Sequence, residues 1–127
     1  MNKVHSTITY GNNANNLDDW QKSANPWTVQ LRYQGRRMTV DFWTGSALGE
    51  PSTADVLECL AMDSSGFENA RSFEDWASEY GYDTDSRKAE RIFKQVEKQS
   101  NKLRNLLGDD YESIIYTDSD DIAKVCG

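Results

Sequence analysis

The sequence has 127 residues, a formal net charge of -7 at pH 7 and 28% charged side chains. A chain of this length is expected to form one domain with a modest hydrophobic core, and it has no apolar run close to the roughly 20 residues that cross a membrane. Its negative charge argues against unassisted binding to nucleic acid or to an anionic membrane, and it suits a basic partner.

The N-terminal segment, residues 1–26, is polar and rich in asparagine, which favours turns over regular structure. We expect a strand over residues 6–10, and otherwise a loop or a mobile arm with Trp20 as its anchor. Residues 27–127 are expected to form the single domain.

A β-hairpin is predicted from the alternation of apolar and polar residues over residues 27–33 and again over residues 38–43. Gly35 lies between the two runs and can supply the positive φ of a tight turn. The apolar positions would face the core. The outer face and the turn carry Arg32, Arg36, Arg37 and Trp43.

Two helices are predicted next, because the apolar period changes after residue 50. Ser52 with Asp55 forms a capping-box-like start, and the Ser-Ser-Gly run at residues 64–66 is expected to end this helix. The second helix is expected to begin at Ser72 and to stop at Gly81. The side chains expected to face inward are Val56, Leu57, Leu60, Ala61, Phe73, Trp76, Ala77 and Tyr80.

A long helix is predicted from about residue 85 to Gly108, roughly 30 Å at 1.5 Å per residue. Asp83 and Asp85 are expected to cap its first N–H groups. A short helix over residues 109–116 follows, and then an acidic tail that is expected to fray. The inward stripe of the long helix is Ala89, Ile92, Phe93, Val96, Leu103, Leu106 and Leu107.

The predicted fold class is therefore α+β. It has a small antiparallel sheet built on the β-hairpin, followed by a helical C-terminal two-thirds that contains one long helix.

The Asp-x-Asp pair at Asp83 and Asp85 resembles the start of a calcium loop. Such a loop needs an oxygen ligand at its fifth position, glycine at its sixth and glutamate at its twelfth. The chain has Arg87, Lys88 and Lys94 at these positions, so cations stand where ligands and a turn are needed. We expect no calcium site.

The other reactive side chains form no recognisable set. His5 is the only histidine, and with Cys59 and Cys126 it makes no zinc site; Cys59 is expected to be a buried small hydrophobe. We therefore expect no metal and no cofactor, and we expect that the protein is not an enzyme. Two cysteines are too few for a disulfide framework, and the N-terminus lacks the apolar stretch of a signal peptide, which favours the cytoplasm.

The charges fall into three blocks. Residues 63–85 hold seven acids and one base, residues 87–104 seven bases and two acids, and residues 105–127 six acids and one base. Acids at helical spacing can occupy a groove built for phosphates, although an acid-rich face also simply keeps a protein soluble. The candidate partner-binding residues are Glu68, Glu74, Asp75, Glu79, Asp83 and Asp85.

The basic block permits a second interpretation. Its cations recur at intervals of three and four, so that several share one helix face, and the hairpin arginines would add to them on a nucleic acid. The same pattern is typical of a solvated helix with intrahelical pairs such as Glu90–Lys94. The recurring cations are Lys88, Arg91, Lys94, Lys98 and Lys102.

Residues 27 to about 108 carry a family resemblance. The stretches WTVQLRYQGRRMTVDFWTGSAL and STADVLECLAMDSSGFENARSFEDWASEYGYDTDSRKAERIFK resemble short proteins of bacteriophages and mobile elements. The resemblance implies a bacterial or phage origin and an intracellular setting. Small acidic phage proteins without catalytic motifs look like the class that contains anti-CRISPR and other anti-defence inhibitors, an analogy that assigns no residues.

Two functions are therefore expected. The first is an inhibitor that binds a host nucleoprotein defence complex, such as a CRISPR effector, and covers its nucleic-acid channel with acidic side chains. The alternative is a small nucleic-acid-binding accessory protein that uses Arg32, Arg36, Arg37 and the basic helix.

Overall fold

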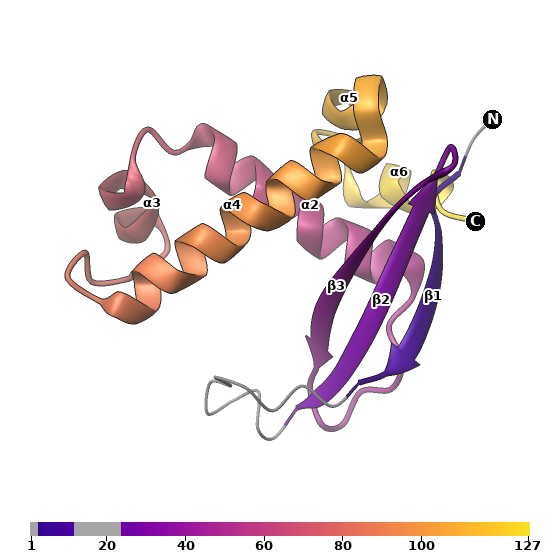
Figure 1. The fold of residues 1–127 in the computed structure, drawn as a ribbon, viewed down its shortest axis with the longest axis horizontal. Coiled ribbons are helices and arrows are strands. Elements are labelled where there is room, and N and C mark those ends of the chain that lie inside the picture. The colour runs from indigo at the N-terminus through magenta and orange to yellow at the C-terminus, as the bar shows by residue number, and fades with distance from the viewer. Residues whose placement is uncertain (1–2, 12–23) are drawn as a thin grey trace.

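The computed structural model describes residues 3–11 and 24–127 and has the predicted α+β fold. Strands β1 (His5–Tyr10), β2 (Asn25–Tyr33) and β3 (Arg36–Thr44) form one antiparallel sheet in the order β1-β2-β3, with the helices on one side (Figure 1). The expected mobile arm with Trp20 lies outside the described residues.

The predicted β-hairpin is confirmed. Its two-residue turn places Gln34 at φ 50° and Gly35 at φ 80°, and two successive positive φ values suit the twist of a tight hairpin. The strand expected at residues 6–10 is present as β1, which pairs with β2 along its length. Val4, just before β1, is fully buried, so the packed body of the protein includes residues well before residue 27.

Helix α2 (Thr53–Asn69) begins with the predicted capping box but is longer than expected. The expected end at residues 64–66 is wrong, because Ser64 faces the interior. Its hydroxyl is 2.8 Å from that of Ser100 and also bonds to Tyr111, so it does not compete for the backbone of its own helix.

Helix α3 (Phe73–Glu79) is capped by Ser72 as predicted, and Gly81 follows it with a φ of 74°. Asp83 and Asp85 do not cap α4 (Arg87–Leu107), and that expectation is wrong. The cap is Ser86, whose hydroxyl accepts from the Ala89 N–H, because the helix begins later than residue 85. The Asp83 carboxylate instead accepts from the Asp85 N–H at 3.2 Å, in the loop before the helix.

The C-terminal segment is packed rather than frayed. After η1 (Gly108–Asp110) and α5 (Tyr111–Ile115), helix α6 (Ser119–Lys124) buries Ile122 in the core. The Val4 N–H donates to the Val125 carbonyl at 2.7 Å, and the Gly127 N–H donates to the Val4 carbonyl at 2.9 Å. The two ends of the chain therefore hold each other, which the acidic composition of the tail did not indicate.

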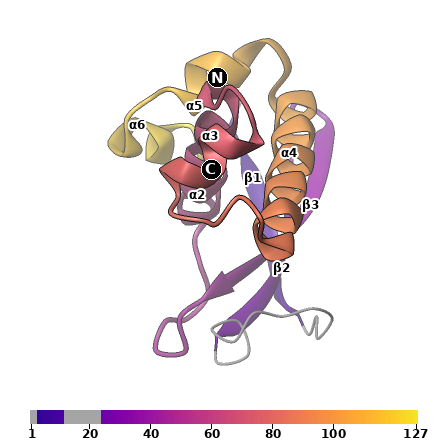
Figure 2. The same cartoon turned by 90° about the vertical axis from the view of Figure 1, so that its left-hand side faces the viewer.

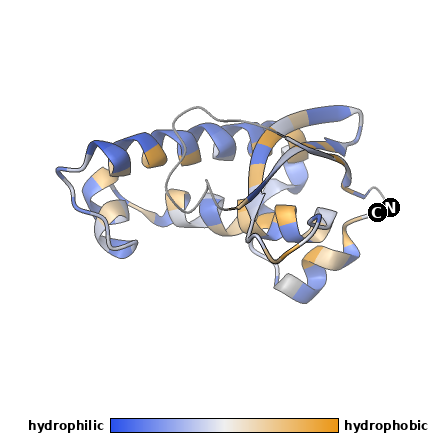
Figure 3. Ribbon diagram, turned by 90° about the horizontal axis from the view of Figure 1, so that it is seen from below, coloured by the Kyte–Doolittle hydropathy of each residue, from blue (hydrophilic) through white to orange (hydrophobic). Residues whose placement is uncertain are grey.

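The main core lies between the inner face of the sheet, α2, the C-terminal half of α4, and α5 with α6. Seen from the α3 end, α2 and α4 form one helical layer (Figure 2). Hydrophilic residues run along most of α4, interrupted by a few hydrophobic ones (Figure 3). The largest side chains with less than 2% exposure include Leu31, Leu57, Leu103, Leu106, Leu107 and Tyr111.

Helix α3 stands apart from this core, at one end of the long axis, whereas the β2–β3 turn and the C-terminus lie toward the other end (Figure 1). It is attached by aromatic rings. The Phe93 ring lies 5.3 Å from that of Phe73, 5.1 Å from that of Trp76 and 5.4 Å from that of Phe67. Phe93 is only half-buried, so the predicted stripe of α4 serves two separate clusters.

Candidate protein-binding groove

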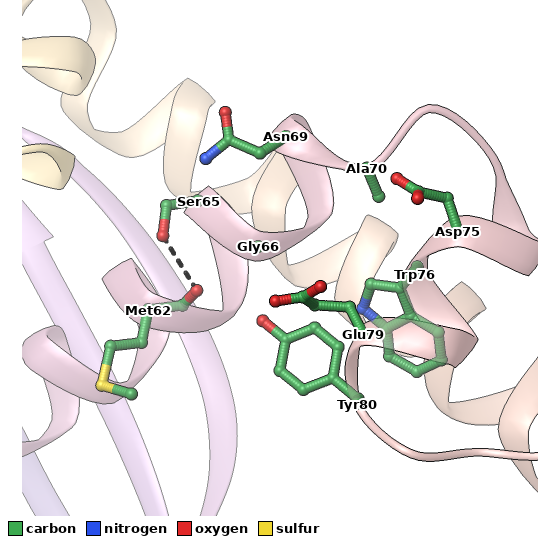
Figure 4. A pocket seen from close by; sticks show the side chains of 9 residues that line it. All are labelled: Met62, Ser65, Gly66, Asn69, Ala70, Asp75, Trp76, Glu79 and Tyr80. Carbon is green, nitrogen blue, oxygen red and sulfur yellow. Dashed lines mark hydrogen bonds between the residues drawn. The ribbon is translucent and has the colours of Figure 1, made fainter.

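A groove of about 490 Å³ separates the C-terminal part of α2 from α3 (Figure 4). Its walls combine carboxylates with aromatic and aliphatic surface, and we call it the α3 groove. The residues that line it are Met62, Ser65, Gly66, Asn69, Ala70, Asp75, Trp76, Glu79 and Tyr80.

The start of α3 fixes the acidic wall of the groove. Asp75 and Glu79 are one turn apart, roughly 6 Å along the axis, and both line the groove. The Asp75 N–H donates to the Ser72 hydroxyl at 3.1 Å, and its carboxylate accepts from the Arg71 N–H at 3.0 Å. Asp75 is therefore held in place by the cap, whereas no such bond holds Glu79 among the described residues.

Tyr80 supplies an aromatic ring to the wall of the groove. It was expected to face inward, but it follows the last residue of α3 and is 47% exposed. Its ring packs on Trp76 at 5.4 Å, and its hydroxyl reaches over Gly66, where any Cβ atom would collide with it (Figure 4). Partial burial, with the charge of Asp63 and then that of Glu79, raises the pKa of the Tyr80 phenol, which therefore stays neutral at physiological pH.

The α3 groove suits a cationic side chain. Met62 is 65% exposed at its edge, so a long aliphatic stem could pack there while its charged head meets the two carboxylates. The rings of Trp76 and Tyr80 add faces that attract a cation. The described residues that line the groove include no histidine, cysteine or lysine, and its ionisable groups are the two carboxylates and the Tyr80 phenol.

The six predicted acids do not form one array. Asp75 and Glu79 line the groove, while Glu74 is exposed on the same helix. Asp83 and Asp85 are exposed in the loop between α3 and α4. These five belong to one end of the molecule, although only two of them share a concave surface.

Glu68 has a different role from the other five. Its carboxylate pairs with the Arg104 guanidinium and accepts from the Tyr116 hydroxyl at 2.8 Å. The Arg104 guanidinium also lies 4.2 Å from the centre of the Tyr111 ring. Glu68 thus links α2 to α4 and α5, and its charge is compensated within the fold.

A second groove, of about 280 Å³, runs between β3, α2 and α4. Cys59 lines it and is exposed, so the expectation that Cys59 is buried is wrong; the main core is on the side of α2 that carries Leu60. Desolvation, and then the charge of Asp63, raises the pKa of the Cys59 thiol, which makes it a poor nucleophile at neutral pH. Desolvation also raises the pKa of the Asp63 carboxyl.

Sequence reasoning did not identify Met62, Gly66 or Tyr80 as parts of a site. Their common surface forms only when α3 packs against α4 and so comes to face α2, which depends on residues distant in the sequence. The one available signal was a glycine inside a helix, at Gly66, which can indicate a close approach by another group.

Two further findings on the described residues concern metal-binding groups and helices that could cross a membrane. Within residues 3–11 and 24–127, no three acidic, histidine or cysteine side chains gather in a way that could hold a metal ion. In the same ranges, no helix combines the length and the hydrophobicity that a membrane crossing requires.

Comparisons with protein-family models, with curated proteins and with solved structures found no match for this chain.

Proposed function

We propose that the chain is a non-enzymatic inhibitor, encoded by a phage or a mobile element, that acts in the cytoplasm of its bacterial host. It binds a host nucleoprotein defence complex of the CRISPR-effector kind and covers a basic nucleic-acid channel. The α3 end of the molecule makes this contact, and the complex itself supplies the cations.

One observation carries the proposal: Asp75 and Glu79 lie on the wall of a groove that also exposes Met62 and Tyr80. A face that only keeps a protein soluble needs carboxylates in water, without apolar surface beside them. Carboxylates next to a thioether and a phenol ring match the head and the stem of arginine or lysine. Such side chains line the channels in which proteins hold phosphates.

The surrounding charges extend this contact beyond the groove. Glu74, Asp83 and Asp85 are exposed around α3, so a basic surface approaching the groove meets further negative charge. Complementary charge speeds the encounter and penalises partners of the wrong sign. The inhibitor would therefore compete with nucleic acid by charge and position, without copying its bases.

The test combines capture with a matched pair of variants. The wild-type protein is used as bait in a bacterial host lysate, the captured complex is identified by mass spectrometry, and its affinity is measured. Asp75→Asn with Glu79→Lys should weaken binding at least 10-fold, because two charge contacts are lost and one becomes repulsive. The amide oxygen that Asp75→Asn leaves in place of the carboxylate can still accept the Arg71 N–H, so the cap of α3 survives.

The control changes the same charges elsewhere. Asp109→Asn with Glu112→Lys alters two exposed acids near α5 and should leave the affinity within about 2-fold. Equal affinity of the groove variant and the wild type would show that the α3 groove is not the binding surface. A captured complex that handles no nucleic acid would contradict the proposed target.

A further inference from the structure

A cluster of cations surrounds the β2–β3 turn, away from α3. It lines two grooves, of about 440 and 420 Å³, which share Arg36 and Arg37. No acidic residue of the described chain lines either groove. We call this set the hairpin cluster, and it consists of Lys3, Arg32, Arg36, Arg37 and Lys102.

Two arginines of the hairpin cluster are held by the fold. The Arg32 guanidinium donates to the Thr7 hydroxyl at 2.6 Å, across the β1–β2 pair. The Arg36 guanidinium donates to the Leu106 carbonyl at 2.7 Å, at the end of α4. A guanidinium has five N–H donors, so most of them remain for a ligand in the grooves.

Two of these arginines bring positive charge together on neighbouring strands. Arg32 lies directly opposite Arg37 on the outer face of the sheet, and His5 flanks Arg32 on its other side. Like charges directly opposite each other on neighbouring strands are destabilising. A bound anion would reduce this repulsion, so the hairpin cluster is a candidate anion-binding site.

The carboxylate beside the turn is bonded to neutral side chains. The Asp110 carboxylate, which lies beside the turn, accepts from the Tyr33 hydroxyl at 2.6 Å and from the Gln34 amide at 3.4 Å. Three ion pairs of the described residues, Glu90–Lys94, Glu68–Arg104 and Asp121–Lys124, include none of the cations of the hairpin cluster.

Most acids of the described chain lie away from this surface; Asp41 is on the same outer face of β3, two rows of paired residues from Arg37. Helix α4 alone is about 30 Å long, roughly three Debye lengths at 0.1 M salt, so the charges around α3 are largely screened here. The acids of α5 and α6 belong to the helical layer on the inner face of the sheet, whereas Arg32 and Arg37 are on the outer face.

The neighbouring side chains indicate which anion fits. The next outward row of the sheet, Thr7, Gln30 and Thr39, is polar. Of the rings that line the grooves, that of Tyr33 is buried, which leaves the small imidazole of His5 as the stacking surface for an unpaired base. A duplex presents closely spaced phosphates on its outside and keeps its bases stacked inside. The surface therefore matches a duplex better than a single strand.

We infer that the hairpin cluster binds the phosphate backbone of double-stranded DNA without reading its sequence. This inference does not depend on the protein partner of the α3 groove. Together the two surfaces would let one small protein contact both the protein and the nucleic acid of a nucleoprotein complex.

Fluorescence anisotropy of a labelled 20-base-pair DNA duplex tests this inference on the full chain. If about four cations neutralise phosphates, affinity falls with salt with a log–log slope near -3.6, roughly 150-fold between 50 and 200 mM. Arg32→Gln with Arg37→Gln should lower the affinity at 50 mM at least 10-fold and reduce the slope to about -1.8. The same variant should change the melting temperature by no more than a few degrees, because it removes the opposed charges and also the hydrogen bond from Arg32 to Thr7.

Two controls separate this surface from others. Lys94→Gln with Lys98→Gln removes the same charge from the exposed face of α4 and should leave duplex affinity within about 2-fold. The groove variant, Asp75→Asn with Glu79→Lys, should lose its protein partner and keep duplex binding. The two measurements therefore test the α3 groove and the hairpin cluster independently.

Three results would overturn the inference. The first is no duplex binding by the wild type at 20 mM salt. The second is equal loss of binding in the α4 control and in the arginine variant. The third is stronger binding to a 20-nucleotide single strand, or to phosphatidylserine vesicles, than to the duplex.

Discussion

Replacing Phe93 with alanine should detach α3 while leaving the main core folded. The Phe93 ring contacts Phe67 of α2, and Phe73 and Trp76 of the α3 helix, at 5.1 to 5.4 Å between ring centres. A fully buried phenylalanine costs about 3–5 kcal/mol when truncated, and Phe93 is half-buried, so we expect about 2–3 kcal/mol. With an unfolding entropy of about 2.1 cal/mol/K per residue, 2.5 kcal/mol lowers the melting temperature by roughly 9 °C.

Amide hydrogen exchange, combined with urea unfolding, measures both parts of this prediction. Exchange should accelerate in α3 and the following loop more than in β2 or α2, because α3 is attached mainly through the aromatic rings. Leu103→Ala is the control: Leu103 is fully buried in the main core, so its truncation should cost about 2–5 kcal/mol and affect all elements. A loss below about 1 kcal/mol for Phe93→Ala, or uniform acceleration, would refute the separate docking of α3.

Three further predictions follow from single features. Gly66→Ala favours the helix but collides with the Tyr80 hydroxyl, so stability should change by less than about 1 kcal/mol while partner affinity falls; unchanged affinity would contradict the described groove. The hydrogen bond to Asp110 raises the pKa of Tyr33 above 10.0, so this stabilisation is complete below pH 10 and is lost as the pH rises through the folded-state pKa. Urea unfolding from pH 8 to 11 should show a larger loss in the wild type than in Tyr33→Phe, which keeps the contribution of the Tyr80 phenol. Finally, adding calcium or EDTA should leave the melting temperature unchanged, and a calcium-induced rise of several degrees would indicate a missed site.

Local sequence signals predicted the elements whose geometry is decided locally. The hairpin follows from alternation around Gly35, and the caps of α2 and α3 follow from Ser52 and Ser72, because each depends on residues within a few positions. The pair at Asp83 and Asp85 shows the limit of this reasoning. Several polar residues preceded the long helix, and the sequence did not indicate that Ser86 would be its cap.

Features that depend on docking between elements were not predictable in the same way. Helix α2 continues through Ser64 because the Ser64 hydroxyl is hydrogen-bonded to the hydroxyls of Ser100 and Tyr111, which belong to other helices. Cys59 is exposed because the main core contacts another side of α2, which the apolar stripe alone did not fix. The candidate acids were therefore identified as a group, whereas their division between the α3 groove and the ion pair of Glu68 required the tertiary structure.

Photo-crosslinking from the edge of the α3 groove tests the proposed function most directly. A photoreactive phenylalanine replaces Met62, which is exposed beside Glu79 and Tyr80, and in a matched variant it replaces Lys94 on α4. After irradiation in the bacterial host, the Met62 position should crosslink to a basic surface of a nucleic-acid-handling complex, and Glu79→Lys should abolish that crosslink. A crosslink from Lys94 with none from Met62, or one that Glu79→Lys leaves unchanged, would contradict the assignment of the groove.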